Sequence, residues 1–206
     1  MPLTLDLAQT VAVGPFNPYI ITPEWLLRYK VCAEDEAADF FPGMLTDGTA
    51  FTIGALEWEV DYRRMMVSSR TIRTREGETC GDKAAKVMRL LNHTPVEAVG
   101  HNFLLTCDLK DWSGKPLPQL GSRMIGEFPD SRQFRWIGAF TRQNVPIEVT
   151  LAVVPTEGVA VRFNHERRTN PQDCGAAVTA AEQFLNDFRI SKQMLGELFQ
   201  VELIDA

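Results

Sequence analysis

The stretch that decides the fold reads Leu90-Leu91-Asn92-His93-Thr94-Pro95-Val96-Glu97-Ala98-Val99-Gly100-His101-Asn102-Phe103. A helical pattern ends at Asn92, Thr94-Pro95 turns the chain, and alternate residues from Val96 onward are mostly apolar, as in a strand. The passage predicts a helix, a proline turn and a strand in the middle of a sheet. His101 and Asn102 interrupt the apolar pattern of that strand, which makes them the first candidate binding residues.

The neighbouring sequence supplies the other elements. Residues 79–91 predict an amphipathic helix, because apolar residues recur at three- and four-residue spacing and Lys83, Lys86 and Arg89 lie on the opposite, solvent-facing side. A second helix begins at Thr22-Pro23, and a long one begins near Asn170 and continues after a break over 191–198. Strands are predicted over 3–13, 50–61, 65–74, 96–109, 134–142, 147–154 and 158–165, and loops over 33–48 and 110–121.

This order of elements predicts the fold class. Short turns join the last three strands, so these strands are antiparallel neighbours. The economical arrangement is α+β, a single antiparallel sheet with the helices packed mainly on one face. No linker rich in Gly, Ser or Pro divides the chain, and no internal repeat is visible. We therefore expect one α+β domain over residues 1–206.

Composition excludes several classes of protein. The 206 residues are 45% hydrophobic and 23% charged, which is typical of a globular domain with a substantial core. The net charge of −6 counts against a general nucleic-acid binder. No apolar run reaches the roughly 18 residues that cross a bilayer, and the N-terminus lacks a signal-peptide pattern. We expect a cytoplasmic protein without membrane contact.

The cysteines point to the same compartment. Cys32, Cys80, Cys107 and Cys174 are widely spaced, without a Cys-x-x-Cys pair or a histidine at zinc spacing. They are predicted to be four reduced thiols. Cys80 stands where a helix begins, a position that can lower the pKa of a thiol, but no neighbouring histidine supplies a base for it.

The candidate binding residues lie on the predicted sheet. His101 shares its strand face with Val99, Phe103 and Leu105, so the first interpretation is a hydrogen-bonded core histidine and the alternative is a pocket residue. Asn102 points to the other face. Four arginines on the later strands offer charge to an anionic or protein partner; they are Arg135, Arg142, Arg162 and Arg168.

Acidic residues precede a basic run. Glu57, Glu59 and Asp61 share one strand face, and the arginines that follow begin at Arg63 and Arg64. Three carboxylates can hold a divalent metal, but the chain lacks a second acidic cluster with a histidine to complete such a site. We expect these carboxylates to form salt bridges with the following arginines, and we expect no metal.

The chain lacks the common catalytic motifs. It has no phosphate-binding glycine loop with Lys-Ser/Thr, no Gly-x-Ser-x-Gly, no His-Glu-x-x-His and no dinucleotide glycine fingerprint. No catalytic residue and no cofactor are predicted.

Two segments carry a resemblance. They are Gly14-Pro15-Phe16-Asn17-Pro18-Tyr19-Ile20-Ile21-Thr22-Pro23-Glu24-Trp25-Leu26 and Leu91-Asn92-His93-Thr94-Pro95-Val96-Glu97-Ala98-Val99-Gly100-His101-Asn102. Both are similar to segments of a group of uncharacterised bacterial proteins of about this length. A weaker similarity, through the Ala-x-Gly-x-Asn strand and the closing helix, extends to a sporadically distributed bacterial family. The resemblance implies a bacterial origin and a single α+β unit, and it implies no site residue.

Three functional hypotheses remain. The first is a non-enzymatic protein that associates with a protein partner or with itself, as a homo-oligomer or as a subunit of a larger complex, because acidic and basic regions can meet across an interface. The second is a nucleic-acid-associated protein that uses the arginine-rich strands. The third is an enzyme centred on His101 and Cys107.

Overall fold

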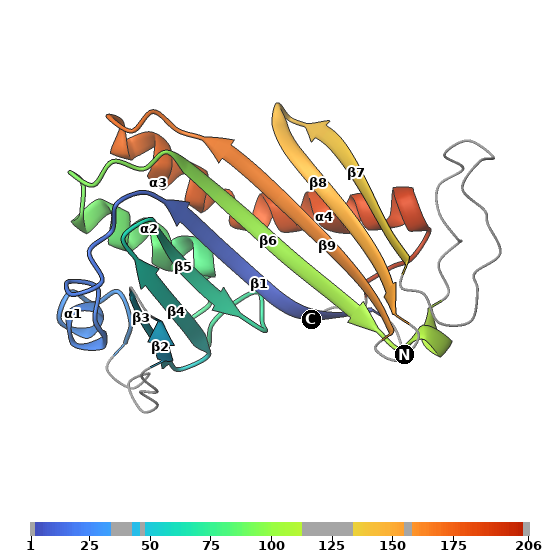
Figure 1. The fold of residues 1–206 in the computed structure, drawn as a ribbon, viewed down its shortest axis with the longest axis horizontal. Coiled ribbons are helices and arrows are strands. Elements are labelled where there is room, and N and C mark those ends of the chain that lie inside the picture. The colour runs from blue at the N-terminus through green and yellow to red at the C-terminus, as the bar shows by residue number, and fades with distance from the viewer. Residues whose placement is uncertain (1–2, 34–42, 46–47, 113–133, 155–157, 204–206) are drawn as a thin grey trace.

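A computed structural model of the chain describes residues 3–33, 43–45, 48–112, 134–154 and 158–203. These residues form an α+β fold built on an open antiparallel sheet, as the sequence predicts (Figure 1). The nine strands lie in the order β2-β3-β4-β5-β1-β6-β9-β8-β7. Their bounds are β1 Thr4–Val13, β2 Gly43–Leu45, β3 Gly48–Ile53, β4 Leu56–Asp61, β5 Arg64–Ser69, β6 Ala98–Cys107, β7 Phe134–Arg142, β8 Val145–Val154 and β9 Gly158–Arg168.

The helices begin close to the predicted positions. Thr22, the predicted cap, caps α1 (Pro23–Arg28). Asp173 caps α3 (Cys174–Glu182), so the long C-terminal helix begins after Asn170, where the sequence predicts its start. α2 (Cys80–Leu90) has a capping box in which Thr79 and Asp82 bond each other's main-chain N–H. The long C-terminal helix divides at Gln183, and α4 (Phe184–Phe199) follows. A short 3-10 turn, η2 (Leu109–Asp111), follows β6.

Two predicted segments differ from the structure. The single strand predicted over 50–61 is wrong, because Gly54 adopts a positive φ of 58° and turns the chain between β3 and β4. The loop predicted over 33–48 contains the short strand β2. Most of the loop predicted over 110–121 lies outside the described residues, but Trp112 packs against Phe199.

The order of strands repeats although the sequence shows no repeat. β1 and β6 pair antiparallel at the centre of the sheet, with Gln9 opposite Asn102. β5, β4 and β3 follow outward from β1, as β9, β8 and β7 follow outward from β6. A helix closes each set, α2 in the first half and α3 with α4 in the second. The halves are therefore related by an approximate two-fold axis perpendicular to the sheet.

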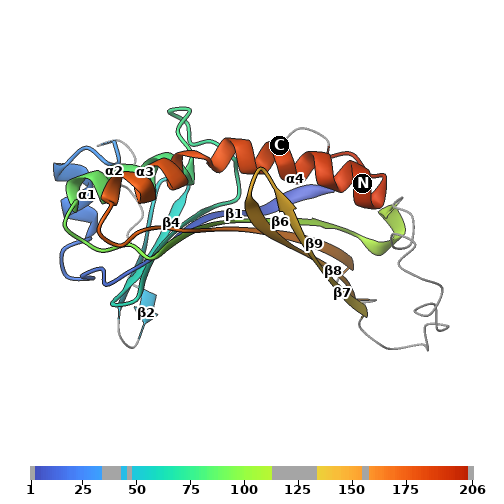
Figure 2. The ribbon, with the colours of Figure 1, turned by 90° about the horizontal axis from the view of Figure 1, so that it is seen from above.

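The sheet is strongly twisted. Figure 2 shows α2, α3 and α4 above it, and the strands at each edge run from the side of these helices at one end to the far side at the other. The core between the layers contains large side chains that are fully buried, among them Trp58, Phe103, Phe163, Phe184 and Phe199. No helix among the described residues is both long and apolar enough to cross a bilayer.

Lys83 differs most from its predicted place. It belongs to the core side of α2, with no exposed side-chain surface, and not to the solvent side. Its Nζ donates to the carbonyl oxygen of Val31 at 2.9 Å, to Glu76 Oε2 at 3.1 Å and to Glu78 Oε2 at 2.9 Å. Burial opposes the charge, but the bonds to Glu78 and Glu76 outweigh it and raise the pKa of Lys83. The ammonium group thus joins α2 to the segments before β2 and after β5.

Replacing this ammonium group is expected to destabilise the fold. Lys83→Met leaves the buried carbonyl of Val31 without its donor and should lower the free energy of unfolding by about 3 kcal/mol. Lys86→Met is the matched control, because Lys86 also pairs with Glu78 but from a partly exposed position, and it should lose less than about 1 kcal/mol. Urea titration measures both, and equal losses would contradict a central role for Lys83.

Candidate functional site

The alternation of β6 assigns every central side chain to one of two faces. Val99, His101, Phe103 and Leu105 are buried on the side of the helices, which we call the helix face. Gly100, Asn102 and Leu104 point to the other side, the open face. The first two candidate residues, His101 and Asn102, therefore point to opposite faces of the sheet.

On the helix face His101 belongs to a buried charged cluster. Its Nδ1 lies 2.7 Å from Oδ2 of Asp187, a fully buried residue of α4. Arg167 of β9 donates from both of its terminal nitrogens to the two carboxylate oxygens of Asp187. One carboxylate thus bonds side chains from two strands, so the cluster fastens α4 to the centre of the sheet.

His165 and Ser191 complete this cluster. Together with Asp187 they have the composition of a Ser-His-Asp triad but not its hydrogen bonds. The Ser191 hydroxyl donates to the main-chain oxygen of Asp187 at 3.0 Å and therefore accepts from Nε2–H of His165 at 2.8 Å. Its proton is committed to the helix backbone, and the other nitrogen of His165 is 3.7 Å from Asp187 Oδ1. Ser191, His165 and Asp187 have no exposed surface for a substrate. The cluster is structural.

Burial and pairing shift the pKa values of these groups in opposite directions. Burial raises the pKa of Asp187, but the bonds from Arg167 and His101 outweigh it and lower the value to about 2. Burial lowers the pKa of His165 to about 4. Burial also holds the pKa of His101 below its ordinary value, although the Asp187 carboxylate acts in the opposite direction. The aspartate is charged and both imidazoles are neutral near pH 7.

The open face has a polar row at its centre. The amide of Asn102 donates to Gln9 Oε1 at 3.0 Å, and the amide of Gln9 donates to Ser68 Oγ at 3.0 Å. Asn164 of β9 stands opposite Asn102 on the other side. The row crosses the four central strands, and the two-fold relation of the halves matches Gln9 with Asn102 and Ser68 with Asn164. These hydrogen bonds fix the orientation of the side-chain amides, so the row is an ordered surface.

A hollow of about 700 Å³ opens beside this row. Gly100 forms part of its floor because it has no side chain, and the apolar walls come from Val11, Val13 and Ala98. Arg162 and Arg168 of β9 lie at its border. The lining combines apolar side chains with charges of both signs, because Glu97 and Glu166 also belong to it.

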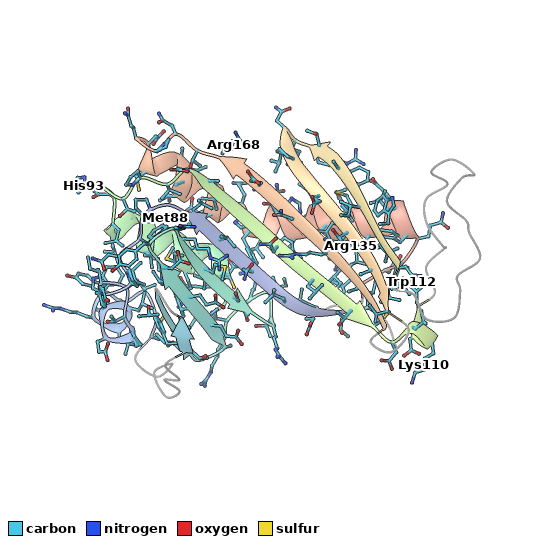
Figure 3. All side chains as sticks on the ribbon, in the orientation of Figure 1. Met88, His93, Lys110, Trp112, Arg135 and Arg168 are labelled. Carbon is cyan, nitrogen blue, oxygen red and sulfur yellow. The ribbon has the colours of Figure 1, made fainter. Side chains whose placement is uncertain are left out.

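Three of the four candidate arginines share the open face. Arg162 and Arg168 border the hollow, and Arg135 of β7 faces the same side, since it pairs with Ala152 and through it with Ala160. Figure 3 shows Arg135 and Arg168 over the half of the sheet that β6 to β9 form. Arg142 lies on the other face, where its Nη2 is 2.6 Å from Glu197 of α4. Glu148 and Glu166 stand among the three open-face arginines.

The acidic side chains of β4 form the opposite end of the open face. The expected salt bridges form only at Asp61, whose Oδ2 is 3.4 Å from Nε of Arg64. The register places Glu57 opposite Ser68 and Glu59 opposite Met66, so neither meets an arginine of β5. Within the described ranges, Glu57, Glu59 and Arg162 make no ion pair. The open face is therefore acidic at one end and carries charges of both signs at the other.

The thiols offer no catalytic group. Burial raises the pKa of Cys80 to about 12, so its place at the start of α2 does not produce a thiolate. Burial also raises the pKa of Cys107, which lies six residues along β6 from His101 and points to the same face. No group of three His, Cys, Asp or Glu side chains in the described part of the chain is arranged to hold a metal ion.

No family model matches the chain, and no curated protein matches it.

The buried cluster predicts how stability depends on pH. The unfolded chain takes up a proton on His165 near its ordinary pKa of 6.5, whereas the folded chain resists this until about pH 4. Stability is therefore complete above pH 6.5 and falls as the pH drops toward 4, with Asp187 adding a further loss below its ordinary value of 3.8. His165 alone should account for about 2 kcal/mol between pH 7 and pH 5.

His165→Gln tests this assignment. The variant should lose correspondingly less stability than the parent between pH 7 and pH 5, as measured by urea titration at each pH. His93→Gln, at an exposed position, is the control and should follow the parent. An unchanged pH dependence in His165→Gln would show that the acid sensitivity arises elsewhere.

Proposed function

We propose that this chain is a non-enzymatic protein-binding module. In this proposal its helices cover mainly one face of the sheet, and the open face takes the partner. The observation that carries the proposal is the hollow at Gly100, which lies on a broad sheet face between an acidic end and an end with charges of both signs. Charges that differ between the two ends of one surface orient a partner more than they add affinity.

The shape and charges of the open face indicate the chemistry of the occupant. The hollow at Gly100 fits a protruding polypeptide segment, such as a helix, better than it fits a second sheet face. Arg162 favours acidic side chains over β9, and Glu57 and Glu59 favour basic side chains over β4. The polar row of Gln9 and Asn102 lies between them and can meet polar groups of the partner.

The other two hypotheses receive less support. A nucleic acid requires a surface of positive charge along its phosphates, but Glu148 and Glu166 interrupt the arginines and the whole chain carries −6. An enzyme centred on His101 and Cys107 requires an accessible histidine, but His101 is fully buried. The proposal places the protein in the cytoplasm of a bacterium, where its four unbonded cysteines remain reduced.

Site-specific photocrosslinking in cells tests this function. A photoreactive amino acid replaces Leu104, which is on the open face beside Asn102, or Leu90, which is on α2 behind the sheet. We expect a discrete protein adduct from position 104 and none from position 90. Adding Arg162→Glu should reduce the adduct about tenfold, the effect of reversing one charge at an interface. Peptide mapping should locate the crosslink in a partner segment with acidic residues.

Three results would overturn the proposal. An adduct that nuclease removes would assign the open face to nucleic acid. Equal adducts from positions 104 and 90 would show non-specific contact. Absence of any adduct at position 104, or an adduct that Arg162→Glu leaves unchanged, would show that this face does not select a partner by charge.

A further inference from the structure

The outer strand β7 carries an inference that does not depend on the open face. In the described sheet, β8 is the only strand that pairs with β7, so one side of its backbone has no strand partner. β7 is nine residues long, whereas β2 at the opposite edge has three. A long outer strand presents a row of N–H and C=O groups that can pair with another chain.

The turn after β7 determines which backbone groups point outward. Gln143 and Asn144 form a two-residue turn with positive φ angles of 50° and 63°, and Arg142 pairs with Val145 across it. In such a hairpin the residues that flank the turn exchange hydrogen bonds, and every second residue does the same. The outward-pointing groups therefore belong to the residues between, which are Arg135, Ile137, Ala139 and Thr141.

The side chains of β7 lack the usual protection of an edge. Natural outer strands carry charged residues or prolines that prevent pairing. From Trp136 to Thr141 this strand has neither, and Ile137 is 52% exposed. The two charges, Arg135 and Arg142, lie near its two ends.

The sequence of β7 complements itself about Gly138. In an antiparallel pairing centred there, Arg135 meets Thr141 and Ile137 meets Ala139, all with outward-pointing backbone groups, and no two arginines meet. Trp136 and Phe140 already lie over Gly138, because an added Cβ would be 2.5 and 2.7 Å from their rings. Two glycines can therefore meet at the axis without a side chain between them. This register also uses the full length of the strand.

We propose that β7 pairs antiparallel with β7 of a second copy of this chain, centred on Gly138. The pairing forms about eight main-chain hydrogen bonds and covers Ile137 with Ala139 of the partner. The two-fold axis is perpendicular to the sheet, so both sets of helices stay on the same side and the two sheets become one.

Paired charges at 137 and 139 test the register. Ile137→Lys with Ala139→Lys places lysine opposite lysine twice in the dimer. Ile137→Glu with Ala139→Lys places opposite charges there instead. Light scattering of the parent should give twice the mass of one chain. The Lys/Lys variant should dissociate at about tenfold higher concentration or more, and the Glu/Lys variant should regain the dimer.

The design separates failed pairing from failed folding. Both positions are exposed, and circular dichroism with thermal unfolding should give similar curves for the two variants. A parent that is monomeric at all concentrations would overturn the proposal. So would a dimer that persists in the Lys/Lys variant, or a Glu/Lys variant that stays as dissociated as the Lys/Lys variant. None of these results bears on the crosslink at position 104.

Discussion

The carboxylate of Asp187 is the interaction on which the rest of the structure depends. It is fully buried, and a buried charge is tolerated only when its partners are in place. Arg167 and His101 supply those partners from β9 and β6, so α4 has one position relative to the two central strands of the second half. Phe184 of the same helix then packs against Phe103 and the ring of His101.

This arrangement places different polar groups on the two faces of the sheet. The titratable and nucleophilic groups, His101, His165 and Ser191, lie between the sheet and α4, where they hold the layers together. The other side of the same strands carries amides, small residues and charges at the surface. A strand whose side chains alternate strictly can carry both sets of groups, because successive side chains never share a face.

The sequence predicted what local patterns determine. The cap at Thr22, the helix near residues 79–91 and the meander of β7, β8 and β9 follow from residue types and spacing. Long-range partners were beyond such patterns. Lys83 has the spacing of a solvent residue, and only the position of Val31 and Glu78 explains its burial. Asp187 shows no signal in its helix that distinguishes it from a surface aspartate.

The candidate site was predictable to a similar degree. The face assignment of His101 and Asn102 followed from alternation, and His101 is the hydrogen-bonded core residue that the first interpretation expected. Arg135 and Arg162 share a face because β7, β8 and β9 pair in the expected order. Arg142 does not share it, since it lies an odd number of positions from Arg135 along the same strand and alternation then places the two side chains on opposite faces. The hollow at Gly100 was not predictable from the sequence, because it depends on the register of β1 and β6.

That register has a consequence for how the chain avoids misfolding. If β6 slipped by one residue against β1, its two sets of side chains would exchange faces. Asp187 would lose its contact with His101 inside the protein, and Gln9 would lose the hydrogen bond from Asn102 outside it. The wrong alignment is thus penalised on both surfaces at once. The centre of the sheet tolerates a single alignment, and each half finds its place from there.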